Sequence, residues 1–464
     1  MIQQVLNKQL LQDVLDSMQA QVLAFGRDER RSLTGTPMDE IGSSERAELL
    51  DSIETAQEYA AAGERAAPDR RGGATDLTLA DRNTYIPRSA ELSNLQSAIE
   101  QYFLEKRPEV LESPRPNDRR GGSVPMAGSQ LTIWQDYLAG RRLFGAFEQT
   151  DIGWINALFA KGIRKFRGKH EFVERPIRKD PIRLADEKVR MIIFGDWGSG
   201  IPRAQNLAKY IQRELRDPEV KDWQRYVVHL GDVYYSGWEY EYKNRFLNYW
   251  PVTLEEKDKI GSFSLNGNHD MYSGGWAYYD YALSDDRFAP WQGKSSLFHL
   301  ANSYWQIFGL DTSHDDAGLK DDQTNWVRGA ARKDLKTILL THHQYCSSFE
   351  EPSRTLIDKI QPVLNEIDVA AWLWGHEHRC MTYKDVSRIR FPRCLGHGGV
   401  PVYQTHVPGA SIPPPGEWEY RDYIDGGLEH WAKFGFAVLD FSREKIAVRY
   451  VDEDGGEDRK ETIV

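Results

Sequence analysis

The chain has 464 residues, of which 40% are apolar and 12% aromatic, and this composition supports a large core and excludes wholesale disorder. Its formal net charge of −11 argues against binding of long nucleic acids through charge. The three cysteines form no C-x-x-C pair, so they indicate neither a zinc knuckle nor a disulfide framework and favour a reducing compartment.

The first segment mixes polar and apolar residues at helical spacing. In residues 1–26, Val5, Leu10 and Leu15 belong to one apolar stripe, which predicts an amphipathic helix. The segment lacks the charged stretch and apolar run of a secretory signal, and no window reaches the about 18 apolar residues that span a bilayer. We therefore expect a cytoplasmic protein without a transmembrane segment.

Further helices are expected at about 44–62, 92–104 and 130–147, separated by loops rich in Pro, Gly and Arg. Two prolines and several charges in 175–184 indicate a linker. Residues 1–185 are therefore predicted to form a mainly helical N-terminal region of unknown role, which could bind a partner.

After Glu187 the sequence changes to short runs rich in Val, Ile, Phe and Tyr. The expected strands are Met191–Phe194, Tyr226–Leu230, Ser262–Leu265, Leu297–Leu300, Trp305–Leu310, Thr337–Leu340, Val369–Trp374, Phe434–Phe441 and Lys445–Val451. Helices are expected over Arg203–Arg216 and Ser353–Glu366. Strands separated by helices, with later strands following one another directly, predict an α/β fold for 186–464, a sandwich of two sheets flanked by helices.

Residues able to bind metal follow five of the expected strands, most of them after a glycine that permits a sharp turn. They are Asp196 in G-D-W-G, Asp232 and Tyr235 in G-D-V-Y-Y-S-G, Asn268 and His269 in G-N-H-D, the pair His342 and His343, and His376 and His378 in G-H-E-H. Each could instead be a turn former or a buried histidine. Five clusters at strand ends, where an α/β sheet holds its site, predict a shared metal centre.

The order of these motifs resembles that of the calcineurin-like metallophosphoesterase superfamily. It is similar to the purple-acid-phosphatase-like variant, in which Gly replaces the His of D-x-H and a Tyr follows the second motif; the resemblance covers about 189–450. It implies two metal ions bridged by Asp232, with His269 as the acid that protonates the leaving oxygen. It implies as ligands Asp196, Tyr235 and His378 for the first ion, and Asn268, His342 and His376 for the second.

The chemistry of such a centre is hydrolysis of a small phosphate ester, either a monoester or a diester. A carboxylate between two cations about 3.5–4 Å apart leaves positions open for water and for a phosphate oxygen. Metal-bound hydroxide would attack phosphorus in line, and the cations would stabilise the charge that develops. A phenolate favours Fe³⁺ at the first site, with Zn²⁺, Mn²⁺ or Fe²⁺ at the second. His376 and His378 can both reach the ions only if G-H-E-H forms a turn.

Two ligand assignments stay open. The family's fourth motif usually continues H-x-P, whereas His342 is followed here by His343 and Gln344, so motif position favours His342 but His343 could be the ligand. Tyr234 precedes Tyr235, and only the three-residue spacing from the preceding aspartate selects Tyr235.

Two further residues are candidates for supporting roles. His397, in C-L-G-H-G-G, could contact the substrate or a ligand, and Asp270 could orient its neighbours or cap the turn that follows. A competing hypothesis is a non-catalytic regulatory or binding protein with a vestigial metal site, whose N-terminal helices bind a partner. The presence of all seven ligand types argues against it.

Overall fold

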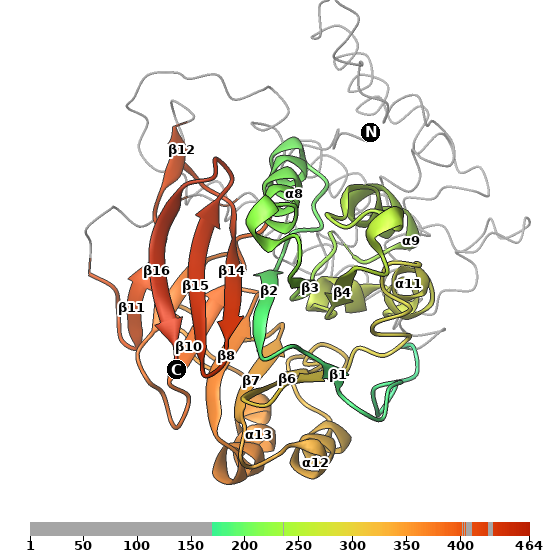
Figure 1. Cartoon of the computed structure of the whole chain (residues 1–464), viewed down its shortest axis with the longest axis vertical. Helices are drawn as coiled ribbons and strands as arrows, with labels where there is room; N and C mark the ends of the chain where they lie inside the picture. The colour runs from blue at the N-terminus through green and yellow to red at the C-terminus, as the bar shows by residue number, and fades with distance from the viewer. Residues whose placement is uncertain (1–168, 235, 401, 403, 405–410, 426–429) are drawn as a thin grey trace, which may run out of the picture. The chain divides into compact units, whose positions relative to one another are not determined.

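The computed structural model of the chain describes residues 169–464 except 235, 401, 403, 405–410 and 426–429 (Figure 1). The helices predicted before residue 169 lie outside the described residues. The described part forms one compact unit. Within it, no helix is long and apolar enough to cross a membrane.

One sheet has six strands in the order β16-β15-β14-β2-β3-β4. Their bounds are β2 (Glu187–Phe194), β3 (Gln224–His229), β4 (Ile260–Ser264), β14 (Gly435–Ser442), β15 (Lys445–Asp452) and β16 (Glu457–Ile463). β2, β3 and β4 run parallel. On the other side of β2, three antiparallel pairs follow in order: β14 with β2, β15 with β14, and β16 with β15. The carboxyl ends of the three parallel strands therefore lie at one edge of the sheet.

The second sheet has eight strands in the order β1-β5-β6-β7-β8-β10-β9-β11. Their bounds are β1 (Ile182–Arg183), β5 (Phe298–Ala301), β6 (Trp305–Gly309), β7 (Lys336–Thr341), β8 (Val369–Trp374), β9 (Cys380–Tyr383), β10 (Phe391–Leu395) and β11 (Gly416–Glu419). β6, β7, β8 and β10 are parallel. A separate two-stranded sheet pairs β12 (Tyr423–Asp425) with β13 (His430–Ala432).

The helices flank the two sheets (Figure 1). They are α8 (Pro202–Leu215), α9 (Glu239–Glu241), α10 (Asn268–Tyr272), α11 (Trp276–Asp280), α12 (Asp321–Ala330) and α13 (Arg354–Glu366), with a π-helical turn η3 (Tyr242–Phe246) directly after α9. Their apolar faces cover the outer faces of the sheets. Leu207 and Ile211 of α8 pack with Ile192 of β2, and Ile360 of α13 packs with Leu339 of β7.

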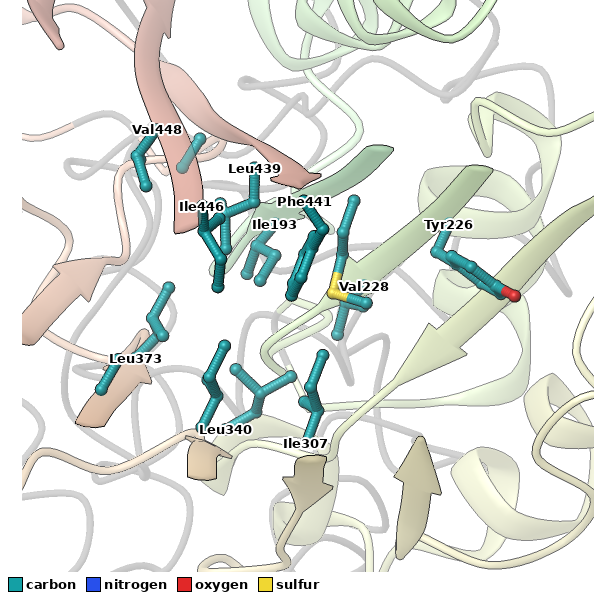
Figure 2. Close-up of a cluster of buried hydrophobic side chains, with 14 of the residues drawn as sticks. Ile193, Tyr226, Val228, Ile307, Leu340, Leu373, Leu439, Phe441, Ile446 and Val448 are labelled. Atoms are coloured by element: carbon teal, nitrogen blue, oxygen red, sulfur yellow. The ribbon is translucent and has the colours of Figure 1, made fainter. Parts of the chain in front are cut away.

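The main core lies between the two sheets, as Figure 2 shows. Because side chains alternate along a strand, one face of β2 supplies Met191 and Ile193 to this core while the other face meets α8. Facing them are Leu340 of β7 and Leu373 of β8 from the second sheet. This shared core fixes the two sheets against each other.

The predicted α/β sandwich is confirmed, and each of the nine expected strands overlaps a strand of the structure. The sequence patterns do not single out α12 or β16. In α12 only two large apolar residues, Trp326 and Val327, face the core, and β16 reads E-D-R-K-E-T-I as a charged edge strand.

Candidate metal centre

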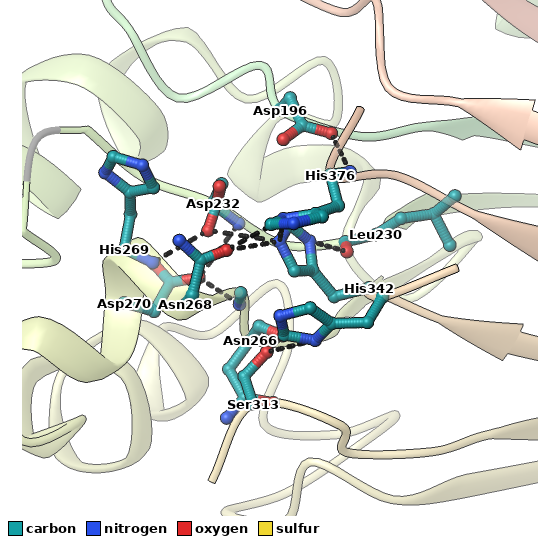
Figure 3. Close-up of polar contacts among 12 residues, drawn as sticks. Asp196, Leu230, Asp232, Asn266, Asn268, His269, Asp270, Ser313, His342 and His376 are labelled. Atoms are coloured by element: carbon teal, nitrogen blue, oxygen red, sulfur yellow. Dashed lines mark hydrogen bonds and ion pairs between the residues drawn. The ribbon is translucent and has the colours of Figure 1, made fainter. Parts of the chain in front are cut away.

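The predicted metal ligands that lie within the described residues come together where the two sheets meet. Asp196, Asp232 and Asn268 follow β2, β3 and β4 of the six-stranded sheet. The histidine ligands follow β7 and β8 of the eight-stranded sheet. Figure 3 shows the side chains of Asp232, Asn268, His342 and His376 converging, with the Asp196 carboxylate beside the backbone of His376.

One group of donor atoms surrounds the hydroxyl of Tyr234. This oxygen lies 3.0 Å from Oδ1 of Asp196, 3.0 Å from Oδ2 of Asp232 and 2.9 Å from Nε2 of His378. Nε2 of His378 is 3.4 Å from Oδ1 of Asp196. Ligands held about 2.0–2.1 Å from one cation at angles of about 90–109° lie roughly 2.9–3.4 Å apart. The spacing in this group therefore fits a shared cation.

A second group lies on the other side of Asp232. Oδ1 of Asn268 is 2.9 Å from Nε2 of His342 and 3.0 Å from Nδ1 of His376, and these two nitrogens are 3.2 Å apart. Oδ1 of Asp232 is 3.5 Å from Nε2 of His342. The two carboxylate oxygens of Asp232 thus face different groups, so this side chain could contribute to both.

Within the second group, the lone pairs of His342 Nε2 and Asn268 Oδ1 face each other. His342 Nδ1 lies 2.9 Å from the Leu230 carbonyl, which can only accept, so Nδ1 carries the proton of the neutral ring and Nε2 carries a lone pair. The Asn268 amide nitrogen donates to the Tyr272 hydroxyl at 2.7 Å, which turns its oxygen toward His342. Two acceptors 2.9 Å apart repel each other unless a cation lies between them.

Backbone strain is concentrated at the same residues. Four of them have left-handed φ angles: Asp196 at 58°, Asp232 at 76°, His376 at 70° and His378 at 50°. This conformation costs free energy in non-glycine residues, which hold it mainly at functional sites. Residues 376–379 form bends, not a strand, so both histidines of G-H-E-H reach the site, as a shared metal centre requires.

The electrostatics of the buried carboxylates also favour a cation. Burial and the neighbouring charge of Asp232 raise the pKa of Asp196 well above its ordinary value, because two carboxylates share a dry site. Burial, together with His376, lowers the pKa of His342 well below its ordinary value and keeps the ring neutral. A neutral imidazole is the form that binds metal, and a cation would favour the ionised carboxylates.

Of the two ligand assignments left open by the sequence, the structure describes both candidates only for the histidine. His342 places Nε2 within the second group, whereas Nδ1 of His343 lies 3.0 Å from the Thr312 hydroxyl. His343 still lies close by, since one ring nitrogen from each of His342, His343 and His376 lies within 4.8 Å of the others. Tyr235 lies outside the described residues.

His269 and Asp270 follow Asn268 on α10. The backbone N–H of His269 donates to Oδ1 of Asp232 at 3.0 Å, and its ring packs between the rings of Tyr234 and Tyr272 at 4.4 and 4.7 Å. Asp270 accepts from the backbone N–H groups of residues 232, 233 and 267. It therefore supports the loop that carries Asp232, in addition to its place in the turn.

His397 lies in the loop after β10, and this loop contacts the loop of Asp196 through their backbones. The backbone N–H of Gly398 donates to the Gly195 carbonyl at 3.0 Å, but the His397 ring packs against Gly435, where a Cβ would come within 2.5 Å of Nε2. Burial lowers the pKa of His397 to about 3.

Two tyrosines that the motifs do not select belong to the site. Residue spacing alone favours Tyr235 over Tyr234, and no motif includes Tyr272. Tyr272 lies four residues after Asn268 on α10, where i and i+4 side chains meet, so helical spacing could have identified it.

Comparison with known proteins identifies a matching family and distant relatives. Residues 189–380 match the family model of the calcineurin-like phosphoesterases. The chain is 24% identical to the tartrate-resistant acid phosphatase type 5 of Homo sapiens over 314 residues, covering 58% of this chain and 89% of that protein. The Rattus norvegicus enzyme is 26% identical over 303 residues, with 58% and 88% covered.

Solved structures give weaker matches. A purple acid phosphatase from yellow lupin (Lupinus luteus) seeds matches with a TM-score of 0.43 at 17% identity, covering 61% of this chain and 54% of that one. A Plasmodium protein described as the anchor in the inner membrane complex matches with a TM-score of 0.42 at 15% identity, covering 59% and 88%.

Proposed function

Because residues 189–380 place this chain in the calcineurin-like phosphoesterase superfamily, we propose that it is a dinuclear metal-dependent hydrolase of small phosphate esters. Asp232 would bridge the two ions. Asp196 and His378, with a tyrosine, would hold the first ion, and Asn268 and His376, with His342, would hold the second.

The observation that carries the proposal is the facing pair of acceptors. His342 Nε2 and Asn268 Oδ1 lie 2.9 Å apart, and each is oriented by a hydrogen bond at the far end of its side chain. Such outer hydrogen bonds are what orient metal ligands. Buried polar atoms are normally paired donor to acceptor, and between His342 Nε2 and Asn268 Oδ1 neither atom has a proton to give.

When bound, the two cations would supply Lewis acidity toward a phosphoryl oxygen and lower the pKa of a water molecule. Orientation of the site and proton transfer would fall to residues of the chain. Asp232 orients both groups and accepts from the His269 backbone, which holds α10 at the edge of the site. His269 would donate a proton to the leaving oxygen.

The metals and the compartment are further parts of the proposal. A phenolate ligand favours Fe³⁺ at the first site, with Zn²⁺, Mn²⁺ or Fe²⁺ at the second. All three cysteines are buried free thiols, which agrees with a cytoplasmic location.

The test is metal analysis combined with hydrolysis of p-nitrophenyl phosphate and its bis-ester. We expect two ions per chain and activity on at least one ester, and we expect Asp232→Asn and His376→Ala to abolish that activity while the far-UV circular dichroism stays unchanged. The exposed Asp286→Asn, whose carboxylate pairs with Lys257 on the surface, is the matched control. Full activity in Asp232→Asn would overturn the proposal, and less than one ion per chain would favour a non-catalytic binding protein.

A further inference from the structure

The residues of the candidate metal centre differ in how far they are buried. Those of the first group are all buried, and in the second group the side chains of Asp232 and His342 are at most 1% exposed. Asn268 and His376 are partly exposed, and the side chain of His376 is 25% exposed. A substrate would therefore reach the centre from the side on which these two residues lie.

Glu350, in the loop between β7 and α13, lies on this exposed side. Its Oε2 is 3.9 Å from Nε2 of His376, and its side chain is 34% exposed. Nδ1 of the same ring lies 3.0 Å from Oδ1 of Asn268, so the ring has the second group at one nitrogen and the Glu350 carboxylate at the other. This carboxylate is therefore near the centre without belonging to the proposed ligands.

Hydrogen bonds hold the loop of Glu350 to the turn that carries His376. The hydroxyl of Ser347 donates to Oε2 of Glu377 at 2.6 Å. Its oxygen accepts from the backbone N–H groups of Phe349 and Glu350 at 2.9 and 3.0 Å. Glu377 lies between the two histidines of G-H-E-H and is 1% exposed. The place of Glu350 beside His376 is thus set by a buried anchor.

The carboxylate of Glu350 has no basic partner within the described residues, where its ion pair is with His376 alone. Arg379, three residues after His376, pairs instead with Glu419 at 3.0 Å. Its guanidinium also lies over the ring of Phe349, 4.5 Å from the ring centroid. The rim of the second group therefore carries a negative charge that an anionic substrate has to approach.

The charge of the substrate decides how strongly this carboxylate opposes it. Near pH 7 a phosphate monoester carries about 1.5 to 2 negative charges, whereas a diester is singly charged, and repulsion grows with the product of the charges. We infer that Glu350 is a specificity residue that makes this centre prefer phosphodiesters to phosphomonoesters. The inference rests on the proposed function and names its substrate class. Water would add to phosphorus, one ester oxygen would leave protonated as an alcohol or phenol, and the same carboxylate would repel the monoester product.

The experiment compares the wild-type protein with Glu350→Gln, which removes the charge and keeps the size of the side chain. The measured quantity is kcat/KM for bis(p-nitrophenyl) phosphate divided by kcat/KM for p-nitrophenyl phosphate. We expect this ratio to fall roughly three- to tenfold, mainly because the monoester is hydrolysed faster, as one unit charge several ångströms away in a partly wet site predicts. Glu350→Lys, which reverses the charge, should lower the ratio further.

Two readouts separate an effect of charge from an effect on the structure. Bound metal should not change in either variant, and inorganic phosphate, which is also a multiply charged anion, should inhibit both variants more strongly than the wild type. Glu351→Gln, at the exposed neighbouring residue, is the matched control and should keep the wild-type ratio and the wild-type inhibition.

An unchanged ratio in Glu350→Gln with wild-type metal content would overturn the inference. Equal losses on both esters would overturn it too, because they would assign this carboxylate to positioning or proton transfer. A wild-type protein that hydrolyses the monoester in preference to the diester would overturn only this inference. A wild-type protein that binds less than one ion per chain, or that hydrolyses neither ester, would overturn the proposed function itself.

Discussion

At the scale of single residues, Asp270 connects the two loops that carry Asp232 and Asn268. Oδ2 accepts from the N–H groups of Asp232 and Gly267 at 2.9 and 2.6 Å, and Oδ1 accepts from Val233 and from the Tyr242 hydroxyl. Burial, followed by the charge of Asp232, raises the pKa of Asp270 to about 7.

We predict that Asp270→Asn destabilises the protein and weakens metal binding. An amide keeps one acceptor oxygen and turns an NH₂ toward two donors, so about two hydrogen bonds are lost, at roughly 1–3 kcal/mol each. Urea denaturation and metal analysis would measure both effects. Asp280→Asn, at an exposed carboxylate beside Lys294 and His170, should change neither, and wild-type metal content in Asp270→Asn would show that this carboxylate does not position the ligands.

A second residue-scale prediction concerns His299, which lies on β5 and is not one of the proposed ligands. Its ring stacks on Phe308 at 4.0 Å, and burial lowers the pKa of His299 to about 4. The folded state therefore binds this proton less readily than the unfolded chain does. Stability from this group is present above the ordinary pKa of about 6.5 and is lost as the pH falls toward 4.

His299→Phe should remove that difference in proton uptake while keeping a ring against Phe308. The slope of unfolding free energy against pH between about 4 and 6.5 should fall by up to about 1.4 kcal/mol per pH unit. Denaturant titrations at several pH values measure the slope. An unchanged slope would mean that the ring is charged in the folded protein.

Which residues form the site could be predicted largely from residue types and spacing. Asp196, Asp232 and Asn268 each follow a buried strand and a glycine or a short turn, and strand ends of a parallel sheet meet at one edge. The position of the Tyr234 hydroxyl beside Asp196 and Asp232 could not be predicted this way, because the left-handed φ of 76° at Asp232 redirects the chain that follows. Spacing counts residues, whereas the direction of a side chain depends on the backbone between them.

At the scale of elements, glycines set how closely the loops approach. A Cβ on Gly267 would lie 1.9 Å from Oδ1 of Asp232, and one on Gly375 would lie 2.6 Å from Oδ2 of Asp196. No side chain fits at either position without moving a proposed ligand. Gly329, in α12, offers a contrast, because a Cβ there would meet no atom within 4 Å outside the backbone of its own helix.

We therefore predict that Gly267→Ala displaces Asp232 and lowers bound metal, with a loss of thermal stability. Gly329→Ala should instead be neutral or stabilise by roughly 0.5–1 kcal/mol, because alanine is the better helix former. Metal analysis and thermal denaturation of the two variants test this directly. Equal metal content in both would show that the close approach at Gly267 is not required.

The elements with the clearest sequence patterns are those packed on both faces. β2, β3 and β7 each contain a run of buried apolar residues, so composition alone identifies them. β16 is charged along its length and depends on partners from other strands, such as Arg393 of β10, which binds Glu461 at 2.7 Å. Contacts of that kind are made only after folding and leave no local pattern.

At the scale of the whole molecule, the site is held by the packing of one sheet on the other. The proposed carboxylate and amide ligands follow strands of the six-stranded sheet, the histidines follow strands of the eight-stranded sheet, and the core between the sheets includes Ile193 and Leu340. Metal binding would therefore join the two sheets at their edge, so that its free energy adds to the stability of the entire fold.

The effect of metal on stability should depend on pH, because cations compete with protons for the ligands. Without a cation, burial and the charge of Asp232 raise the pKa of Asp196, so the metal-free fold favours the protonated carboxyl and loses stability as the pH rises. With cations bound, the ionised carboxylates are stabilised and that loss disappears.

Removal of the ions by a chelator should accordingly lower the melting temperature, and by more at about pH 7.5 than at about pH 5.5. Thermal denaturation with and without chelator at both pH values gives the two shifts, and Asp232→Asn, which lacks the bridging carboxylate, should show neither. A chelator shift that is the same at both pH values would mean that the ions bind without displacing protons from these carboxylates.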